Sequence, residues 1–206
     1  PGFGPAKWQN GLSADPTPDL SRVPITPYVL PPKDSIFQNG NFTTPSLADW
    51  QKIGDPGQIR VIEGDVELGG GQLSVGNYGG YPLLLPELGV RRSTNLALLH
   101  KPVLGFSLQF TSYIDNDSMS VSIDTGESVT DLLVVTETVS IPYSSPLLFT
   151  YTNYGGGYKA YFFDLTPWQT QQITLSLLIK SGGDNIIRGT FSLLAISLGS
   201  WTTPVI

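Results

Sequence analysis

The chain has 206 residues and a net charge of -6, from 11 lysines and arginines against 17 aspartates and glutamates. Only 14% of the residues are charged, against about 25% in an average globular protein, and the sequence holds no cysteine and one histidine. These counts exclude thiol nucleophiles, disulfide frameworks, iron–sulfur clusters and multi-histidine metal sites within one chain. An acidic chain without a Lys/Arg-rich stripe also argues against nucleic acid as a partner.

Residues 1–35 contain eight of the 17 prolines. Proline fixes φ and lacks a backbone donor, so this stretch is neither a helix nor a central strand, and we expect an extended, partly polyproline II arm. Its composition also fits a disordered linker. We expect instead an arm that docks, in cis or in trans, through its large apolar residues: Phe3, Trp8, Ile25, Tyr28, Val29 and Leu30.

From residue 36 onward the apolar residues recur with a period of two. Residues 104–110, 119–123, 161–165 and 173–179 alternate in this way, which predicts half-buried strands, and residues 191–198 predict a more fully buried last strand. Glycine-rich turn signals separate the strands, for example at residues 69–71, 155–157 and 182–185. A helical period is not sustained, and residues 47–53 are expected to form one helical turn at most. The pattern predicts an antiparallel all-β sandwich over residues 36–206.

Several segments resemble one family. The opening Gln38-Asn39-Gly40-Asn41-Phe42, followed by Asp49-Trp50, resembles the first strand of galactose-binding-like and carbohydrate-binding-module jelly rolls. Residues 104–123, 163–179 and 189–198 resemble later strands of that family, so the resemblance spans about residues 36–200. It implies a jelly roll in which Phe42 and Trp50 cap one end of the core and the last strand returns beside the first. It also implies an extracytoplasmic setting (periplasmic, cell-surface or secreted), and we expect a signal peptide to have been removed.

The resemblance bears on metal binding as well. Many modules of this family hold calcium with a carboxylate after the opening Phe and an Asp in the last strand. The corresponding positions here are Thr43 and either Ala195 or Ser197, which carry no charge, whereas a hard cation needs six to eight oxygens. We therefore expect no metal and no cofactor. The acidic residues of the predicted turns are weak candidates for a different metal site or ordinary turn caps: Asp115, Asp117 and Asp184.

Two glycine- and tyrosine-rich loops have the composition of a sugar-binding site. Flat aromatic faces contact sugar CH groups, and neighbouring amides bind hydroxyls. The candidate residues are Asn77, Tyr78 and Tyr81 in one loop and Asn153, Tyr154 and Tyr158 in the other. The alternative is that these tyrosines pack on neighbouring strands or on the arm. Trp168 is expected to belong to the core.

Catalytic signals are sparse. Glu63, Asp65 and Glu67 alternate along one predicted strand, which is typical of a solvated face. The single His100 has no G-x-S-x-G elbow to serve, and we expect it at the surface near a strand end. Arg91 and Arg92, with His100 and Lys101, are predicted to form one small basic patch that could meet an acidic partner. We therefore expect a protein that is not an enzyme.

The sequence supports two functions of different classes. The first is a non-catalytic structural or accessory subunit of a larger extracytoplasmic assembly, docked on other protein subunits through its arm and a sheet face. The alternative is a carbohydrate-binding module that uses the two tyrosine loops. A third interpretation is a jelly-roll glycosidase or lyase acting through paired carboxylates. No window has the roughly 20 apolar residues of a membrane-spanning helix.

Overall fold

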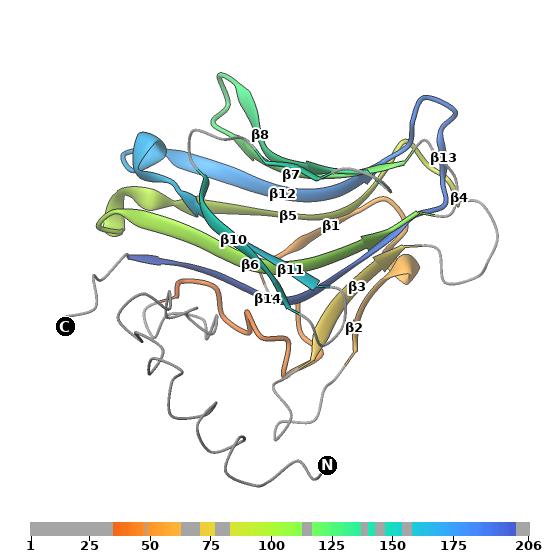
Figure 1. Ribbon diagram of the computed structural model, residues 1–206, viewed down its shortest axis with the longest axis horizontal. Helices are drawn as coiled ribbons and strands as arrows, with labels where there is room; N and C mark the ends of the chain where they lie inside the picture. The colour runs from red at the N-terminus through yellow and green to blue at the C-terminus, as the bar shows by residue number, and fades with distance from the viewer. Residues whose placement is uncertain are drawn as a thin grey trace, which may run out of the picture.

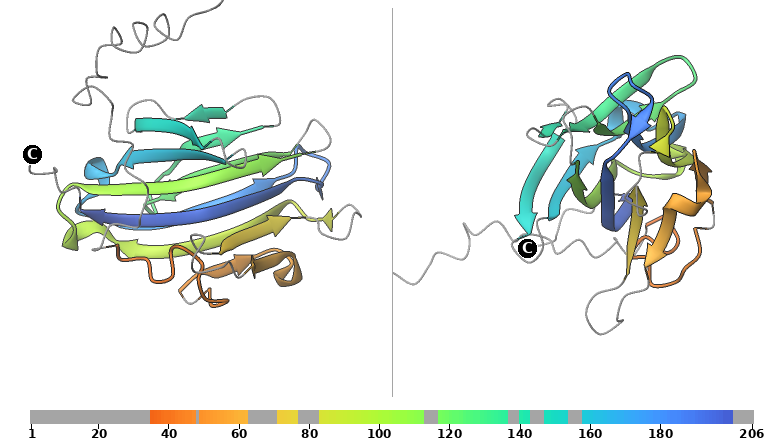
Figure 2. Two further views of the ribbon diagram at one scale, coloured as in Figure 1. Left: turned by 60° about the horizontal axis from the view of Figure 1, so that its bottom comes forward. Right: turned by 90° about the vertical axis from the view of Figure 1, so that its right-hand side faces the viewer.

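The computed structural model describes residues 35–47, 49–62, 71–76, 83–112, 117–136, 140–142, 147–153 and 158–200. Most of these residues form two antiparallel sheets packed face to face (Figure 1, Figure 2). The predicted arm therefore lies outside the described residues, apart from Ser35. No helix within the described ranges has the length and apolarity to cross a bilayer.

Each of the two large sheets has six strands among the described residues, and every pairing is antiparallel. Sheet A runs, in spatial order, β1 (Gln51–Ile53), β5 (Glu87–Asn95), β12 (Gln172–Lys180), β7 (Ser118–Asp124), β8 (Val129–Val135) and β9 (Ser140–Pro142). Sheet B runs β10 (Leu147–Asn153), β11 (Tyr158–Asp164), β6 (Pro102–Thr111), β14 (Thr190–Ser200), β3 (Gln72–Gly76) and β2 (Ile59–Ile62). The all-β sandwich is confirmed.

Short elements complete the fold. Strands β4 (Leu83–Leu84) and β13 (Ile186–Ile187) pair with each other beside the sandwich. Among the described residues, 3-10 turns join strands at η1 (Pro56–Gln58), η3 (Leu96–Leu98) and η4 (Thr166–Trp168). The prediction of at most one helical turn for residues 47–53 is wrong for the last three residues. Gln51–Ile53 is strand β1, because its backbone pairs with β5.

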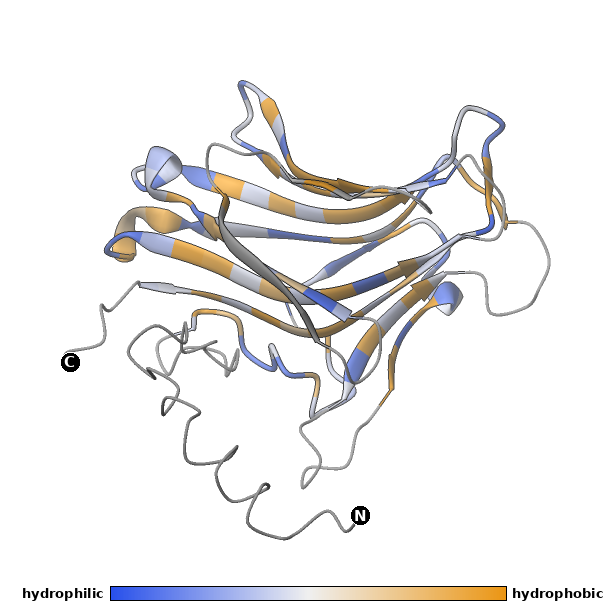
Figure 3. Ribbon diagram, in the orientation of Figure 1, coloured by the Kyte–Doolittle hydropathy of each residue, from blue (hydrophilic) through white to orange (hydrophobic). Residues whose placement is uncertain are grey.

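The core follows the predicted alternation. Leu104, Phe106 and Leu108 of β6 are buried between the sheets, and the residues between them face outward. Figure 3 shows the same alternation of apolar and polar positions along the long strands. In β14 a register shift between Leu193 and Ala195 moves the inward positions by one residue, so that Ile196 follows Leu193 in the core.

The segment before β1 lies beside the last strand, as the resemblance implies. The Ile36 N–H donates to the Leu198 carbonyl at 2.8 Å, and the Ile196 N–H donates to the Gly40 carbonyl at 2.7 Å. A Cβ on Gly40 would lie 2.1 Å from the Ile196 carbonyl oxygen, so only glycine permits this approach. Phe42 follows with 2% of its surface exposed and closes the core at this end.

Arg92 of sheet A binds the segment that precedes β1. Its side chain is 10% exposed and lies over the Phe37 ring, 4.7 Å from the ring centroid. One terminal nitrogen, Nη2, is 3.3 Å from both the Ile36 carbonyl oxygen and Asp49 Oδ2. Burial lowers the pKa of Arg92, and the Asp49 carboxylate opposes that shift. Trp50 packs on Phe37 with the ring centroids 5.5 Å apart, in the capping position expected of it.

The predicted basic patch is wrong. Arg91 and Arg92 are successive residues of a strand, so their side chains lie on opposite faces of sheet A. Arg91 pairs with Glu87 on the outward face at 3.1 Å, while Arg92 is buried at the edge of the core. His100 and Lys101 are exposed beyond η3, so the four cations share no surface.

Candidate functional site

Five strand termini lie at one end of sheet B, here called the tyrosine end. The register pairs Gly76 with Thr190, Thr190 with Thr111, and Asn153 with Tyr158. Residues 77–82 directly follow β3, and residues 154–157 join β10 to β11. Both predicted tyrosine loops therefore leave the sandwich from this end, although they are separated by more than 70 positions in the sequence.

The structure describes only two of the six predicted sugar-binding residues, and only one of them with its side chain. Asn77, Tyr78, Tyr81 and Tyr154 lie outside the described residues. Asn153 is described as the last residue of β10, by its backbone alone. Tyr158, the first residue of β11, is described with its side chain.

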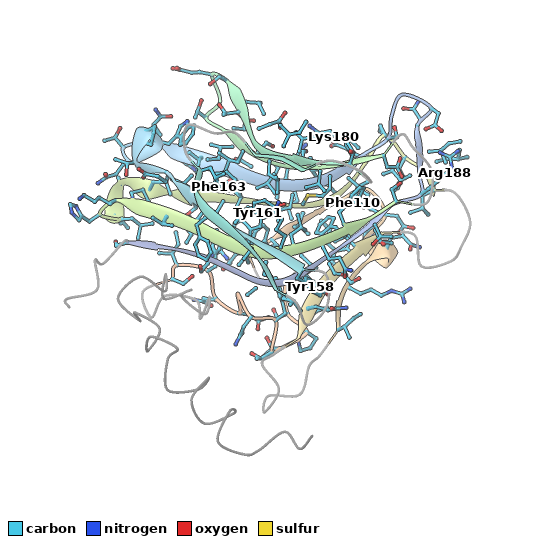
Figure 4. The ribbon with its side chains drawn as sticks, in the orientation of Figure 1. Phe110, Tyr158, Tyr161, Phe163, Lys180 and Arg188 are labelled. Carbon is cyan, nitrogen blue, oxygen red and sulfur yellow. The ribbon has the colours of Figure 1, made fainter. Side chains whose placement is uncertain are left out.

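The Tyr158 side chain lies on the outward face of sheet B, because Tyr161 and Phe163 of the same strand point into the core. Tyr158 is labelled in Figure 4. Its hydroxyl donates to Gln72 Oε1 at 2.8 Å. Since Gln72 belongs to β3, the two side chains bridge the intervening strands β6 and β14. The ring is half-buried. Burial raises the pKa of Tyr158, and a hydrogen bond with Ser192 opposes the rise.

A row of neutral polar residues crosses the sheet beneath this contact. The register sets Tyr158 beside Gln109, Gln109 beside Ser192, and Ser192 beside Ser74. These four residues, here called the transverse row, all face outward. The Ser74 and Ser192 hydroxyl oxygens are 3.5 Å apart. Amide and hydroxyl groups can each donate and accept hydrogen bonds. Gln109 and Ser192 are half-buried and offer both functions without a charge, whereas Ser74 is only 4% exposed.

Sequence reasoning missed Gln72, Ser74, Gln109 and Ser192. Their signal was present as the polar positions of alternating strands. Nothing in that alternation tells which polar positions lie side by side, because neighbouring residues of the row come from different strands.

Two of the three weak metal candidates, Asp117 and Asp184, accept hydrogen bonds that hold the fold together. Asp117 is 3% exposed, and its Oδ2 accepts the backbone N–H groups of Arg188 and Gly189 at 2.5 and 2.6 Å. Asp184 pairs with the Arg188 side chain at 2.8 Å and caps the Ile186 N–H. These two hydrogen bonds, that from Arg188 first, lower the pKa of Asp184. Asp117 and Asp184 thus both cap backbone N–H groups, which is the role that the sequence left open beside a metal site.

In the part of the chain that the structure describes, no three His, Cys, Asp or Glu residues gather in a way that could hold a metal ion. Asp115 lies outside that part.

Of the catalytic candidates, His100 belongs to the described residues. His100 is exposed, and its backbone N–H donates to Ser200 Oγ at 3.0 Å. Glu63, Asp65 and Glu67 lie outside the described residues, beyond the end of β2. Trp168 packs against the core from η4, as predicted.

No family model and no curated protein matches the chain. Three of the solved structures that it resembles are carbohydrate-binding modules. TmCBM61, solved with β-1,4-galactotriose, has 12% identity and a TM-score of 0.49 over 80% of this chain and 97% of its own. A module specific for non-crystalline cellulose, CBM28, has 13% identity and a TM-score of 0.45 over 82% and 97%. The mannan-recognising TmCBM27 has 15% identity and a TM-score of 0.36 over 77% and 92%. Likeness at this level says nothing about a ligand of this chain.

Proposed function

We propose that this chain is a non-catalytic carbohydrate-binding domain that binds a neutral glycan at the tyrosine end of sheet B. The observation that carries the proposal is the Tyr158 ring, held on the outward face by its 2.8 Å hydrogen bond to Gln72. Sugar rings present apolar CH faces together with many hydroxyls. An aromatic ring surrounded by uncharged hydrogen-bonding groups matches both features.

The hydrogen bond to Gln72 also prepares Tyr158 for binding. A tyrosine that is already fixed in one position loses little side-chain entropy when a ligand packs on it, so more of the contact energy becomes affinity. The Ser192 contact holds the same hydroxyl from a second strand. The site is thus built on paired strands, which position side chains more firmly than loops do.

Charge favours a neutral ligand. The transverse row carries no charged side chain from Tyr158 to Ser74, and Arg60 follows at the edge strand β2. The chain as a whole has a net charge of -6, which disfavours polyanionic glycans. The row from β11 to β3 crosses three strand spacings, about 14 Å, which suits a short stretch of oligosaccharide better than one sugar.

The other interpretations remain predictions. An assembly role depends on the arm, which lies outside the described residues. The glycosidase or lyase interpretation depends on carboxylates that lie mostly there as well. An extracytoplasmic setting, where glycans are accessible, accompanies the carbohydrate-binding proposal.

Calorimetric titration with a panel of neutral oligosaccharides and polysaccharides tests the proposal. We expect binding by the full chain and a loss of about 30-fold in the variant Tyr158→Ala, the cost of removing a central aromatic contact of about 2 kcal/mol. Gln72→Ala should weaken binding less, because it frees the ring without removing it. The matched control is Thr174→Ala, on the outward face of sheet A, which should bind normally.

Two results would count against the proposal. If the full chain binds no neutral glycan, the proposed function is wrong. If it binds a glycan but Tyr158→Ala and Gln72→Ala retain full affinity with unchanged circular dichroism, the glycan binds at another site.

A further inference from the structure

The outward face of sheet B changes character beyond the transverse row. Toward the other end of the sheet the outward residues are small or apolar apart from Asp164, the last residue of β11. Six of them form the surface that we call the apolar half: Val103, Gly105, Ala160, Phe162, Ala195 and Gly199. The outward face of an antiparallel sheet is normally polar, because it meets water. Here Phe162 is only 7% exposed and Ala160 only 1%, although both point away from the core.

Phe162 forms the centre of the apolar half. The register places it beside Gly105 of β6, and Gly105 beside Ser197 of β14. A Cβ on Gly105 would lie 2.8 Å from Cε1 of the Phe162 ring. The ring therefore lies against the glycine and forms an apolar floor across β11 and β6.

The proline-rich arm joins the sandwich beside this floor. Ser35 Oγ accepts the Leu198 N–H at 3.3 Å, and the Ile36 N–H donates to the Leu198 carbonyl. Leu198 itself points into the core, so its neighbours Ser197 and Gly199 face outward on the apolar half. The Arg92 side chain, bonded to the Ile36 carbonyl, holds this junction in place.

A short part of the arm next to the junction is long enough to reach Phe162. From the junction beside β14, Phe162 on β11 is three strand spacings away, or about 14 Å. An extended proline-rich chain covers that distance in about four to five residues at about 3.1 Å each. Counting back from Ser35, this brings Val29 and Leu30 to the Phe162 ring.

We propose that residues 24–34 of this chain cross the outward face of β14, β6 and β11, and that Val29 and Leu30 pack on Phe162. Pro24, Pro27, Pro31 and Pro32 suit this role, because an extended proline-rich segment needs no strand partner and docks well on aromatic surfaces. The arm then docks in cis and leaves only the tyrosine end of the outward face of sheet B open to a ligand.

The absence of cysteine makes a direct test possible in the full chain. A nitroxide attached to Thr26→Cys should broaden nearby amide signals in a nuclear magnetic resonance spectrum. We expect the amides of Gly105 and Phe162 to lose most of their intensity, and those of Ser120 and Ser176 in sheet A to keep theirs. A nitroxide on Ala14→Cys, farther from the junction, should broaden the Gly105 and Phe162 amides less.

Two matched substitutions in the labelled chain separate docking from chance proximity. Leu30→Ser should restore the intensity of the Gly105 and Phe162 amides, while Leu20→Ser should leave them broadened. Broadening confined to sheet A, or none at all, would overturn the proposal. A mixed sample gives a third outcome that would overturn it. If isotope-labelled molecules without a nitroxide are broadened by unlabelled molecules that carry one, the arm docks on another copy.

Discussion

Removal of the Asp117 carboxylate should destabilise the fold through two specific backbone groups. Asp117 Oδ2 accepts the N–H groups of Arg188 and Gly189, and the Asp117 side chain is 97% buried, since 3% is exposed. The substitution Asp117→Ala leaves both donors without a partner in a place that water reaches poorly. Each unsatisfied buried donor costs about 1–3 kcal/mol, so we expect the two donors together to lower the free energy of unfolding by about 2–6 kcal/mol.

Urea denaturation followed by circular dichroism measures this loss. Asp117→Asn is the matched variant, because its carbonyl oxygen can still accept both N–H groups, and it should lose about 1–2 kcal/mol as the charge assistance disappears. Asp131→Ala, at an exposed position of β8, is the surface control and should stay within about 0.5 kcal/mol of the parent chain.

Two results would refute this role of the Asp117 carboxylate. If Asp117→Ala unfolds at the same urea concentration as the parent chain, the carboxylate does not hold the turn before β14. If calcium raises the midpoint of the parent chain but not that of Asp117→Ala, Asp117 serves as a metal ligand, and its role as a backbone acceptor is wrong.

Two further predictions concern the close approach at the first strand and the ion pair at the β13 turn. Gly40→Ala should lower the free energy of unfolding by about 1–3 kcal/mol or more, because its Cβ would lie 2.1 Å from the Ile196 carbonyl oxygen. Thermal melting should show the loss, and the control Gly57→Ala, at an exposed turn, should melt like the parent chain. Asp184 has a lowered pKa in the folded chain, so it contributes stability above its unfolded pKa and loses that contribution as pH falls through the folded pKa. Comparing Asp184→Asn with the parent chain between pH 6 and pH 3 should therefore show a small stability difference that vanishes in acid, and a constant difference would refute this assignment.

The sequence by itself was sufficient for five strands, β6, β7, β11, β12 and β14, and for most of the residues by which they enter the core. The alternation in residues 104–110 and 173–179 identifies β6 and β12 and their inward residues, because side chains of a strand point alternately to its two faces. The same rule should have separated Arg91 from Arg92. The predicted basic patch failed because closeness along the sequence was taken for closeness on the surface.

The candidate site was decided by the tertiary structure. Tyr158 and Gln72 are 86 positions apart, and Asp117 is 71 positions from the Arg188 N–H that it accepts. Local alternation marks Gln109 and Ser192 as outward polar residues but is silent on their neighbours. Hydropathy and backbone geometry act over a few residues, so they determine which segments become strands. The order of the strands depends on hydrogen bonds and packing between distant segments, and that order alone brings the transverse row together.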